Sequence, residues 1–276
     1  MTRRSGRDSR TPGVIVLFGS GELTPTGRKI HEDVFRRVSL SAPVKIGILE
    51  TPTGFEVNAM HGWPERMEDF FREHLRDWKP DIVRIPAWRR DGEKSTNTPS
   101  TVDVIREIDY LYSGAGSPSY VITHLRDTLA WKRMMEAHAR GATLCLGSAT
   151  AVAIGRVALP VYEIYKAGED IHWIEGLDIL KPYGISIAVI PHWNNTEGED
   201  FDTTRCWMGM KRFETLRRML PPNITILGID ETTACCIDSA KNTFEVLGTG
   251  SAHIIRHDMP ERTVNAGESH TLDGLR

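Results

Sequence analysis

Short runs of apolar residues alternate along the chain with segments in which apolar residues recur every third or fourth position. An apolar run of about four to eight residues that ends at Gly or Pro is typical of a buried parallel strand, and the wider spacing is typical of an amphipathic helix. The runs predict strands over 14–18, 44–49, 81–85, 110–113, 142–146, 185–190 and 224–227. Strands and helices that alternate in this way predict an α/β fold with a doubly wound, mostly parallel sheet.

Helices are predicted in the intervals between these strands. The first covers 26–38, a short one covers 102–108, and a long one begins at the N-cap Ser117 and Pro118 and continues to about residue 140. A further short helix is predicted from Ala149. An amphipathic helix with one face on the sheet is predicted by the spacing of Trp63, Met67, Phe70, Phe71, Leu75 and Trp78.

The C-terminal part of the chain has a different pattern. Segments 232–238 and 243–255 are strand-like and are separated by Ser239-Ala240-Lys241-Asn242, so they predict an antiparallel hairpin that completes the fold. With 276 residues, the chain is within the range of one α/β domain, which we expect over 12–270. Residues 1–11 are basic and have no apolar core behind them, so we expect a disordered tail rather than a signal peptide.

Composition and charge exclude some classes of partner. The formal net charge of -3 gives no broad positive field, so a nucleic-acid partner is not expected. No run approaches the roughly 18 apolar residues of a membrane span, so no membrane partner is expected and a cytoplasmic location is predicted. The oligomeric state is left open, a homodimer included, because interface and core residues look alike in sequence.

The four cysteines do not form a metal-binding or disulfide pattern. Cys145, Cys206, Cys235 and Cys236 contain no C-x-x-C pair, so we expect reduced, mostly buried thiols. His253 and His257 fall in a strand-like segment, where an i, i+4 pair would lie about 13 Å apart. No metal site is therefore expected.

Three reactive side chains each follow an apolar run. Ser148 follows 142–146, His192 follows 185–190, and Glu231 follows 224–227. Loops at the carboxyl ends of parallel strands are where α/β proteins assemble their sites. A serine hydroxyl needs a base within hydrogen-bond reach, and an imidazole base is usually oriented by a carboxylate. Each residue also has an ordinary structural interpretation, but their shared placement favours a hydrolase site.

Acyl transfer also needs hydrogen-bond donors for the oxyanion that forms on the substrate. The backbone amide of Ala149 is one candidate, because it lies at the start of the predicted helix after Ser148. A second amide is expected from Ala115 or Gly116, at the N-terminus of the helix that begins at Ser117.

Four segments resemble, in order, motifs of the dipeptidase E and cyanophycinase family of serine peptidases. They are Gly114-Ala115-Gly116, Gly147-Ser148-Ala149-Thr150-Ala151, Ile190-Pro191-His192 and Gly228-Ile229-Asp230-Glu231. The resemblance extends over 14–255 and implies a class I glutamine amidotransferase-like fold, a flavodoxin-like three-layer sandwich. It also implies a cofactor-free Ser-His-Glu triad of Ser148, His192 and Glu231, and cleavage of small peptides beside an aspartyl residue.

The chain departs from the family at the nucleophile. The family pattern is Gly-x-Ser-x-Gly. In this chain Leu146 and Thr150 occupy the two glycine positions of that pattern, and the glycine is displaced to Gly147, directly before Ser148. Small residues fit there because strand and helix crowd together at a strained turn. The alternative is therefore a member of the fold that is not a peptidase, acting as a binding or regulatory protein or on another acyl substrate.

Substrate contacts are suggested by residues near the predicted triad. An aspartyl carboxylate could pair with the guanidinium of Arg205, and Asn194 follows His192 closely enough to line the same cleft. Glu22, beyond the first strand, could also line it. A surface or turn role would explain each of these residues too.

Two other enzyme classes match the sequence poorly. The dinucleotide fingerprint G-x-G-x-x-G fails after Gly19-Ser20-Gly21 because position 24 is Thr24, and no phosphate-binding G-x-x-x-x-G-K-[ST] loop is present. A glutamine amidotransferase would have cysteine where this chain has Ser148, and Cys145 lies within the preceding strand.

Overall fold

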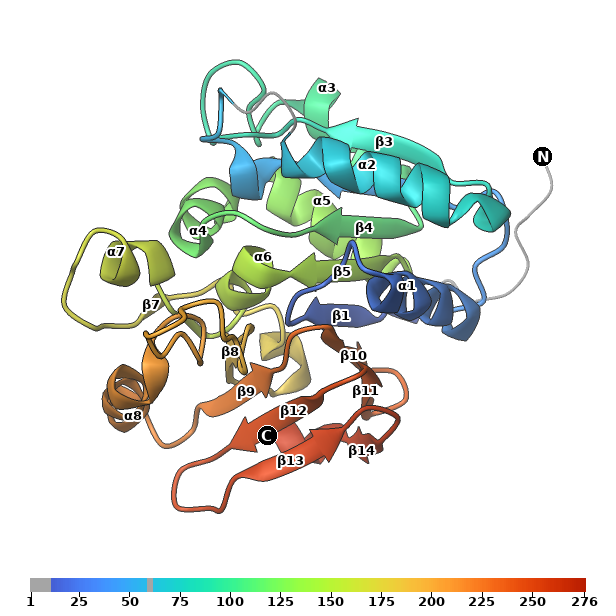
Figure 1. The fold of residues 1–276 in the computed structure, drawn as a ribbon. Helices are drawn as coiled ribbons and strands as arrows, with labels where there is room; N and C mark the ends of the chain where they lie inside the picture. The colour runs from blue at the N-terminus through green and yellow to red at the C-terminus, as the bar shows by residue number, and fades with distance from the viewer. Residues whose placement is uncertain (1–10, 59–61) are drawn as a thin grey trace.

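Five adjacent parallel strands form the centre of the fold in the computed structural model, which describes residues 11–58 and 62–276 (Figure 1). The tail predicted over 1–11 lies outside the described residues except for Thr11. The parallel strands are, in spatial order, β1 (Ile15–Phe18), β5 (Thr143–Gly147), β4 (Tyr110–Ser113), β2 (Lys45–Leu49) and β3 (Asp81–Ile85). The predicted α/β class with a mostly parallel sheet is confirmed.

Three antiparallel strands extend this sheet beyond β1. They are β10 (Thr233–Asp238), β11 (Thr243–Gly248) and β14 (Ser269–Thr271). The predicted hairpin is present as the β10–β11 pair, but its second segment is not one strand. The chain turns at Gly248, whose φ is +107°, and continues as β12 (Ser251–Ile255) in another sheet.

A second sheet contains the strands that precede His192 and Glu231. Its order is β13 (Arg262–Asn265), β12, β9 (Thr225–Ile229) and β8 (Ile187–Ile190), with β8 and β9 parallel. A small third sheet pairs β6 (Val157–Ala158) with β7 (Ile174–Glu175). The sequence pattern suggested one sheet for all the parallel strands, and this was wrong. Hydrophobic runs identify buried strands but do not specify which strands pair.

The central sheet is covered on both faces. Alternate side chains of β1 point in opposite directions. Helices α1 (Pro25–Arg37) and α2 (Trp63–His74) lie on one face of the sheet (Figure 1). Val16 and Phe18 pack with these helices, whereas Leu17 belongs to the core on the opposite face. The remaining helices are α3 (Pro99–Val102), α4 (Pro118–Leu125), α5 (Leu129–Ala139), α6 (Ser148–Ala153), α7 (Val161–Tyr165) and α8 (Gly209–Met219). Short 3₁₀ helices are η1 (Thr51–Thr53), η2 (Arg76–Trp78), η3 (Asp103–Glu107), η4 (Lys181–Tyr183) and η5 (Leu272–Leu275).

Three helix predictions need correction. The long helix expected from Ser117 to about residue 140 is divided into α4 and α5, because Asp127 has a φ of +56° and Thr128 caps a new helix through the amide of Trp131. The helix expected over 63–78 ends at His74 and is followed by η2. The short helix expected over 102–108 is instead α3 followed by η3. Over 11–58 and 62–276, no helix has the length and apolar character needed to cross a membrane.

Candidate active site

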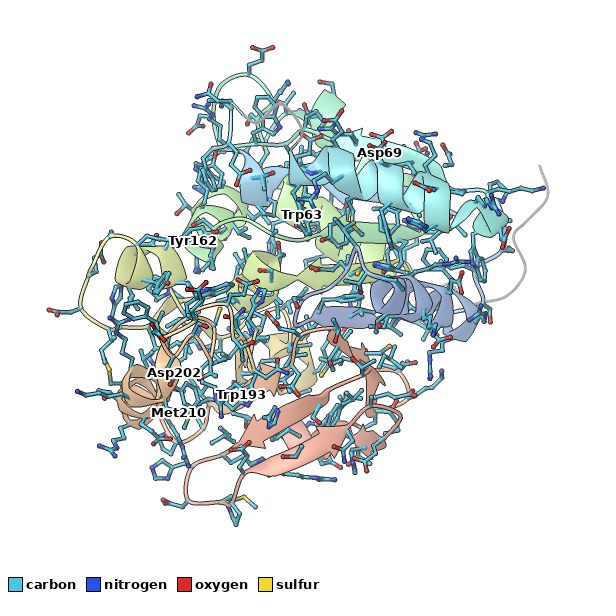
Figure 2. The ribbon with its side chains drawn as sticks, in the orientation of Figure 1. Trp63, Asp69, Tyr162, Trp193, Asp202 and Met210 are labelled. Carbon is cyan, nitrogen blue, oxygen red and sulfur yellow. The ribbon has the colours of Figure 1, made fainter. Side chains whose placement is uncertain are left out.

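A cavity of about 460 Å³ opens where β1, β4, β5 and β8 end. It lies between loops of the central sheet and loops of the second sheet. Trp63 and Tyr162, both labelled in Figure 2, contribute to its wall. Its lining consists of Ser20, Gly21, Glu22, Trp63, Ala115, Gly116, Pro118, Ser148, Ala149, Val152, Val161, Tyr162, Tyr165, Lys166, His192, Glu197, Cys206 and Trp207.

Ser148 stands at the turn between β5 and α6. Its φ is +44°, in the left-handed region that a residue with a side chain seldom adopts. Such a conformation costs on the order of 1–2 kcal/mol, and strain of this kind often accompanies functional sites. The turn has the strained strand-to-helix form of a nucleophile elbow and directs Ser148 toward the cavity.

The residues flanking Ser148 fit this turn. Thr150 is fully buried, and its hydroxyl donates a 3.1 Å hydrogen bond to the carbonyl of Gly114 and lies 3.1 Å from Ser113 Oγ. Leu146 is buried within β5. The larger residues at these two positions are therefore accommodated by packing and hydrogen bonds, and the turn keeps its strained form.

Gly147 is needed for steric reasons. A Cβ at this position would lie 2.0 Å from Glu22 Oε1, well inside contact distance. We therefore predict that Gly147→Ala forces the elbow or Glu22 to move and destabilises the protein by about 1–3 kcal/mol, as overpacking does. Urea unfolding measures this. Gly274→Ala is the matched control, because a Cβ there meets its nearest neighbour at an ordinary 3.6 Å. Equal stability of the two variants would contradict the assigned contact.

His192 lies between the other two members of the predicted triad. Its Nε2 is 3.0 Å from Ser148 Oγ, and its Nδ1 is 3.1 Å from Glu231 Oε1. The backbone of His192 is also left-handed, with a φ of +50°, and its amide donates to the carbonyl of Gly19. The ring packs against Trp207 at a centroid distance of 4.7 Å. With the Nδ1 proton directed to Glu231, Nε2 is free to accept the proton of Ser148.

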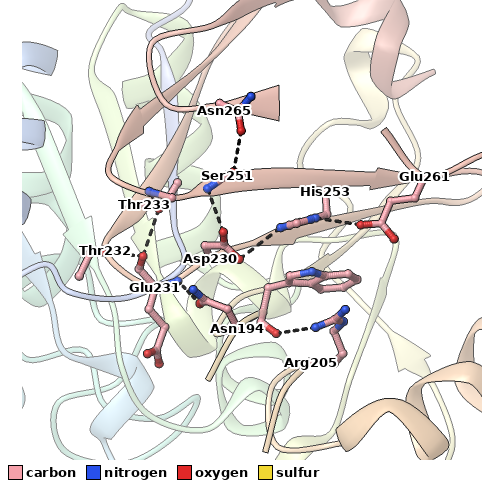
Figure 3. Close-up of polar contacts among 12 residues, drawn as sticks. Asn194, Arg205, Asp230, Glu231, Thr232, Thr233, Ser251, His253, Glu261 and Asn265 are labelled. Atoms are coloured by element: carbon pink, nitrogen blue, oxygen red, sulfur yellow. Dashed lines mark hydrogen bonds and ion pairs between the residues drawn. The ribbon is translucent and has the colours of Figure 1, made fainter. Parts of the chain in front are cut away.

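Glu231 is held by several hydrogen bonds. Asn195 Nδ2 donates to Glu231 Oε1 at 2.9 Å. The amide of Glu231 donates to Asn194 Oδ1 at 2.8 Å (Figure 3). The hydrogen bond with His192, followed by that with Asn195, outweighs partial burial and lowers the pKa of Glu231 below its ordinary value. The carboxyl is therefore ionised at neutral pH, as an orienting group for an imidazole should be.

The two predicted substrate ligands occupy other positions. The guanidinium of Arg205 lies 4.0 Å from the ring centre of Trp193 and donates to the Trp193 carbonyl (Figure 3). The Asn194 side chain bonds to the Glu231 backbone. Neither belongs to the described residues that line the cavity. Arg205 is the first of three consecutive left-handed residues, at +57°, +59° and +63°, a turn that directs its side chain onto Trp193.

The predicted oxyanion-binding residues Ala115, Gly116 and Ala149 all line the cavity. Ala149 is in the first turn of α6, where backbone amides have no partner within the helix. Gly116 has a φ of +144°, and a Cβ there would meet the Pro52 carbonyl oxygen at 1.9 Å, so only glycine fits. Both loops therefore border the cavity together with Ser148.

His253 and His257 do not share one strand as the sequence suggested, because β12 ends at Ile255. His253 lies between Asp230 Oδ1 at 3.2 Å and Glu261 Oε1 at 2.8 Å (Figure 3). Across 11–58 and 62–276, no group of three or more His, Cys, Asp or Glu side chains is arranged to hold a metal ion.

Several cavity residues could not be recognised from the sequence. Lys166 and Trp207 line the cavity from segments that carried no recognisable motif. Asn195, which donates to the Glu231 carboxylate, was not among the predicted site residues. The only feature of the sequence that could have indicated Asn195 was its position three residues after His192, the candidate base.

Solved structures with the same fold include peptidases. One is the crystal structure of a peptidase from an acI-B1 Actinobacterium, with a TM-score of 0.74 and 22% identity over 96% of this chain and 98% of that one. Another is a proposed peptidase E protein from Listeria monocytogenes EGD-e, with a TM-score of 0.54 and 14% identity over 93% of this chain and 100% of that one. No protein-family model matches the chain, and no curated protein matches it. The chain therefore has a peptidase E-like fold.

Proposed function

We propose that the protein is a serine hydrolase of the peptidase type, with Ser148 as nucleophile, His192 as general base and Glu231 as the orienting acid. The observation that carries this proposal is the continuous hydrogen-bonded series from Ser148 Oγ through both ring nitrogens of His192 to Glu231 Oε1, at 3.0 and 3.1 Å, beside a cavity. The similar fold of solved peptidases supports it.

The reaction follows from these positions. Ser148 Oγ attacks the peptide carbonyl while His192 Nε2 takes its proton, and the oxyanion is stabilised by backbone amides of the two adjacent loops. His192 then returns the proton to the leaving amine as the C–N bond breaks. Water, deprotonated by His192, hydrolyses the resulting acyl-enzyme and releases Ser148. No cofactor takes part in this scheme.

We propose small peptides with an aspartyl residue on the acyl side of the cleaved bond as substrates, of the dipeptidase E or cyanophycinase type. The sequence motifs support this choice. Lys166 supports it as well, because it is the one lysine or arginine among the described lining residues and could attract a carboxylate. Arg205, with its guanidinium on Trp193, is no longer the preferred ligand.

A fluorophosphonate probe tests the reactive serine without knowledge of the substrate. We expect it to label the wild-type protein at Ser148, with the site identified by peptide mass spectrometry. In His192→Ala the labelling rate should fall by about 100-fold or more, because the general base is lost. Equal labelling of the two proteins would exclude His192 as the base. Absence of labelling in a folded wild type would favour the alternative, a binding or regulatory protein.

A further inference from the structure

Glu22 is a buried acid within the candidate active site. Its exposed fraction is only 2%, yet it belongs to the cavity lining together with Ser148 and His192. It follows β1 and directly precedes the turn in which Thr24 caps α1. The proposed triad of Ser148, His192 and Glu231 does not include the Glu22 carboxyl group, although Glu22 lines the same cavity as Ser148.

A hydrogen-bonded relay ends at this carboxyl. Trp63 Nε1 donates to the Tyr112 hydroxyl at 3.0 Å, and Tyr112 donates to Glu22 Oε1 at 3.4 Å. Because Oε1 accepts from Tyr112, a proton held by the carboxyl would reside on Oε2. The relay also lies against both loops that flank the nucleophile. A Cβ at Gly114 would be 2.0 Å from the Tyr112 hydroxyl, and one at Gly147 would be 2.0 Å from Glu22 Oε1.

The surroundings of Glu22 disfavour its charged form. Within the described part of the chain, no lysine or arginine forms an ion pair with it. Burial raises the pKa of Glu22 and outweighs the opposing effects of its backbone, of His192 at the end of β8 and of Tyr112 on β4. Cys145 on β5 is a further neighbouring titratable group, and Lys166 and Glu197 are the other charged lining residues. An isolated buried carboxylate is costly, whereas burial of a hydrogen-bonded neutral carboxylic acid costs much less.

We propose that Glu22 serves the cavity as an uncharged carboxylic acid whose Oε2 hydroxyl donates a hydrogen bond to a carboxylate on the acyl side of the substrate. A charged Glu22 would repel such a group, and a neutral one pairs with it through a charge-assisted hydrogen bond. Glu22 thereby determines specificity for aspartyl over asparaginyl substrates. This inference rests on the proposed function, because it assigns a ligand to that substrate.

Paired substrates test the assignment. kcat/KM is measured between pH 6 and 10 for an aspartyl dipeptide and its asparaginyl counterpart, with wild type, Glu22→Gln, Glu22→Ala and the control Glu73→Gln on the exposed face of α2. Gln keeps a donor that does not titrate, so Glu22→Gln should retain aspartyl turnover within about threefold. Glu22→Ala should lose about 10- to 100-fold on the aspartyl peptide, the value of one charge-assisted hydrogen bond, and clearly less on the asparaginyl peptide.

The pH dependence separates Glu22 from its neighbours. Ionisation of Glu22 as the pH rises should lower wild-type turnover of the aspartyl peptide, and Glu22→Gln should lack that decline because an amide does not titrate. Equal losses on both peptides in Glu22→Ala, or a Glu22→Gln variant as impaired as Glu22→Ala, would overturn the assignment. The Glu73→Gln control should match wild type throughout.

Two measurements distinguish failure of this inference from failure of the proposed function. Fluorophosphonate labelling measures the reactivity of Ser148 in every variant, and this reactivity tests the proposed triad independently of the role of Glu22. Infrared spectroscopy at neutral pH measures the protonation state of Glu22 and needs no substrate. A band from a protonated carboxyl should be present in wild type and Glu73→Gln and missing in Glu22→Gln. Absence of that difference would refute the uncharged acid even in a protein that hydrolyses nothing.

Discussion

Replacement of Ser148 by alanine is expected to lower kcat for peptide hydrolysis by about 10⁶-fold, which is the loss expected when the nucleophile of a serine triad is removed. In the proposed mechanism this hydroxyl forms the acyl-enzyme, and its Oγ lies 3.0 Å from His192 Nε2, the proposed base. The measurement is the release of aspartate from aspartyl dipeptides and from aspartyl-arginine peptides, followed by mass spectrometry. The residual rate should come only from substrate positioning and oxyanion-binding amides.

The matched control is Ser41→Ala, at an exposed position outside the cavity lining. It should retain wild-type turnover. Turnover that persists in Ser148→Ala would mean that another group performs the attack. If the wild type cleaves none of these peptides but is labelled at Ser148, the serine mechanism holds and the acyl substrate must be sought elsewhere.

Much of the central sheet could be predicted because most of its strands are buried on both faces and appear as short apolar runs. Segment 110–113 agrees residue by residue with the buried strand β4, and 81–85 agrees with β3, the partly exposed strand at the edge of the sheet. The division between α4 and α5 was harder to predict, since Arg126 and Asp127 are neither Gly nor Pro. The apolar spacing continues through them, and the break depends on the left-handed Asp127 and the Thr128 cap.

The candidate site, like the fold, could be predicted only where it depends on the apolar runs of the sequence. Ser148, His192 and Glu231 each follow an apolar run, so their positions at strand ends could be predicted, and in the structure they lie within hydrogen-bond distance in series. The position of Arg205 could not be predicted. Its side-chain direction depends on a left-handed turn that is stabilised by tertiary contacts with Trp193 and His192, including backbone hydrogen bonds to both carbonyls.

Glu231→Gln is expected to lower kcat by up to about 10⁴-fold, the loss found when an amide in place of a triad acid also stabilises the wrong histidine tautomer. The amide has no charge to stabilise the imidazolium that forms when His192 takes the serine proton. Asn195 Nδ2 donates toward the Oε1 position, so it favours the amide oxygen there and opposes the wrong histidine tautomer. The loss should therefore reflect the missing charge, and kcat should change more than KM. Initial rates of turnover measured over a range of substrate concentrations give both kcat and KM.

The depressed pKa of Glu231 also predicts how the variant's stability varies with pH. A carboxyl with a lower pKa in the folded protein stabilises it above the unfolded-state pKa, and this contribution is lost as pH falls through the folded-state pKa. Glu231→Gln should thus unfold at lower urea concentration than wild type near pH 7, and the difference should shrink on acidification. A difference that grows toward acid pH would show that Glu231 is not held as a carboxylate by His192 and Asn195, and the orienting role would fail with it.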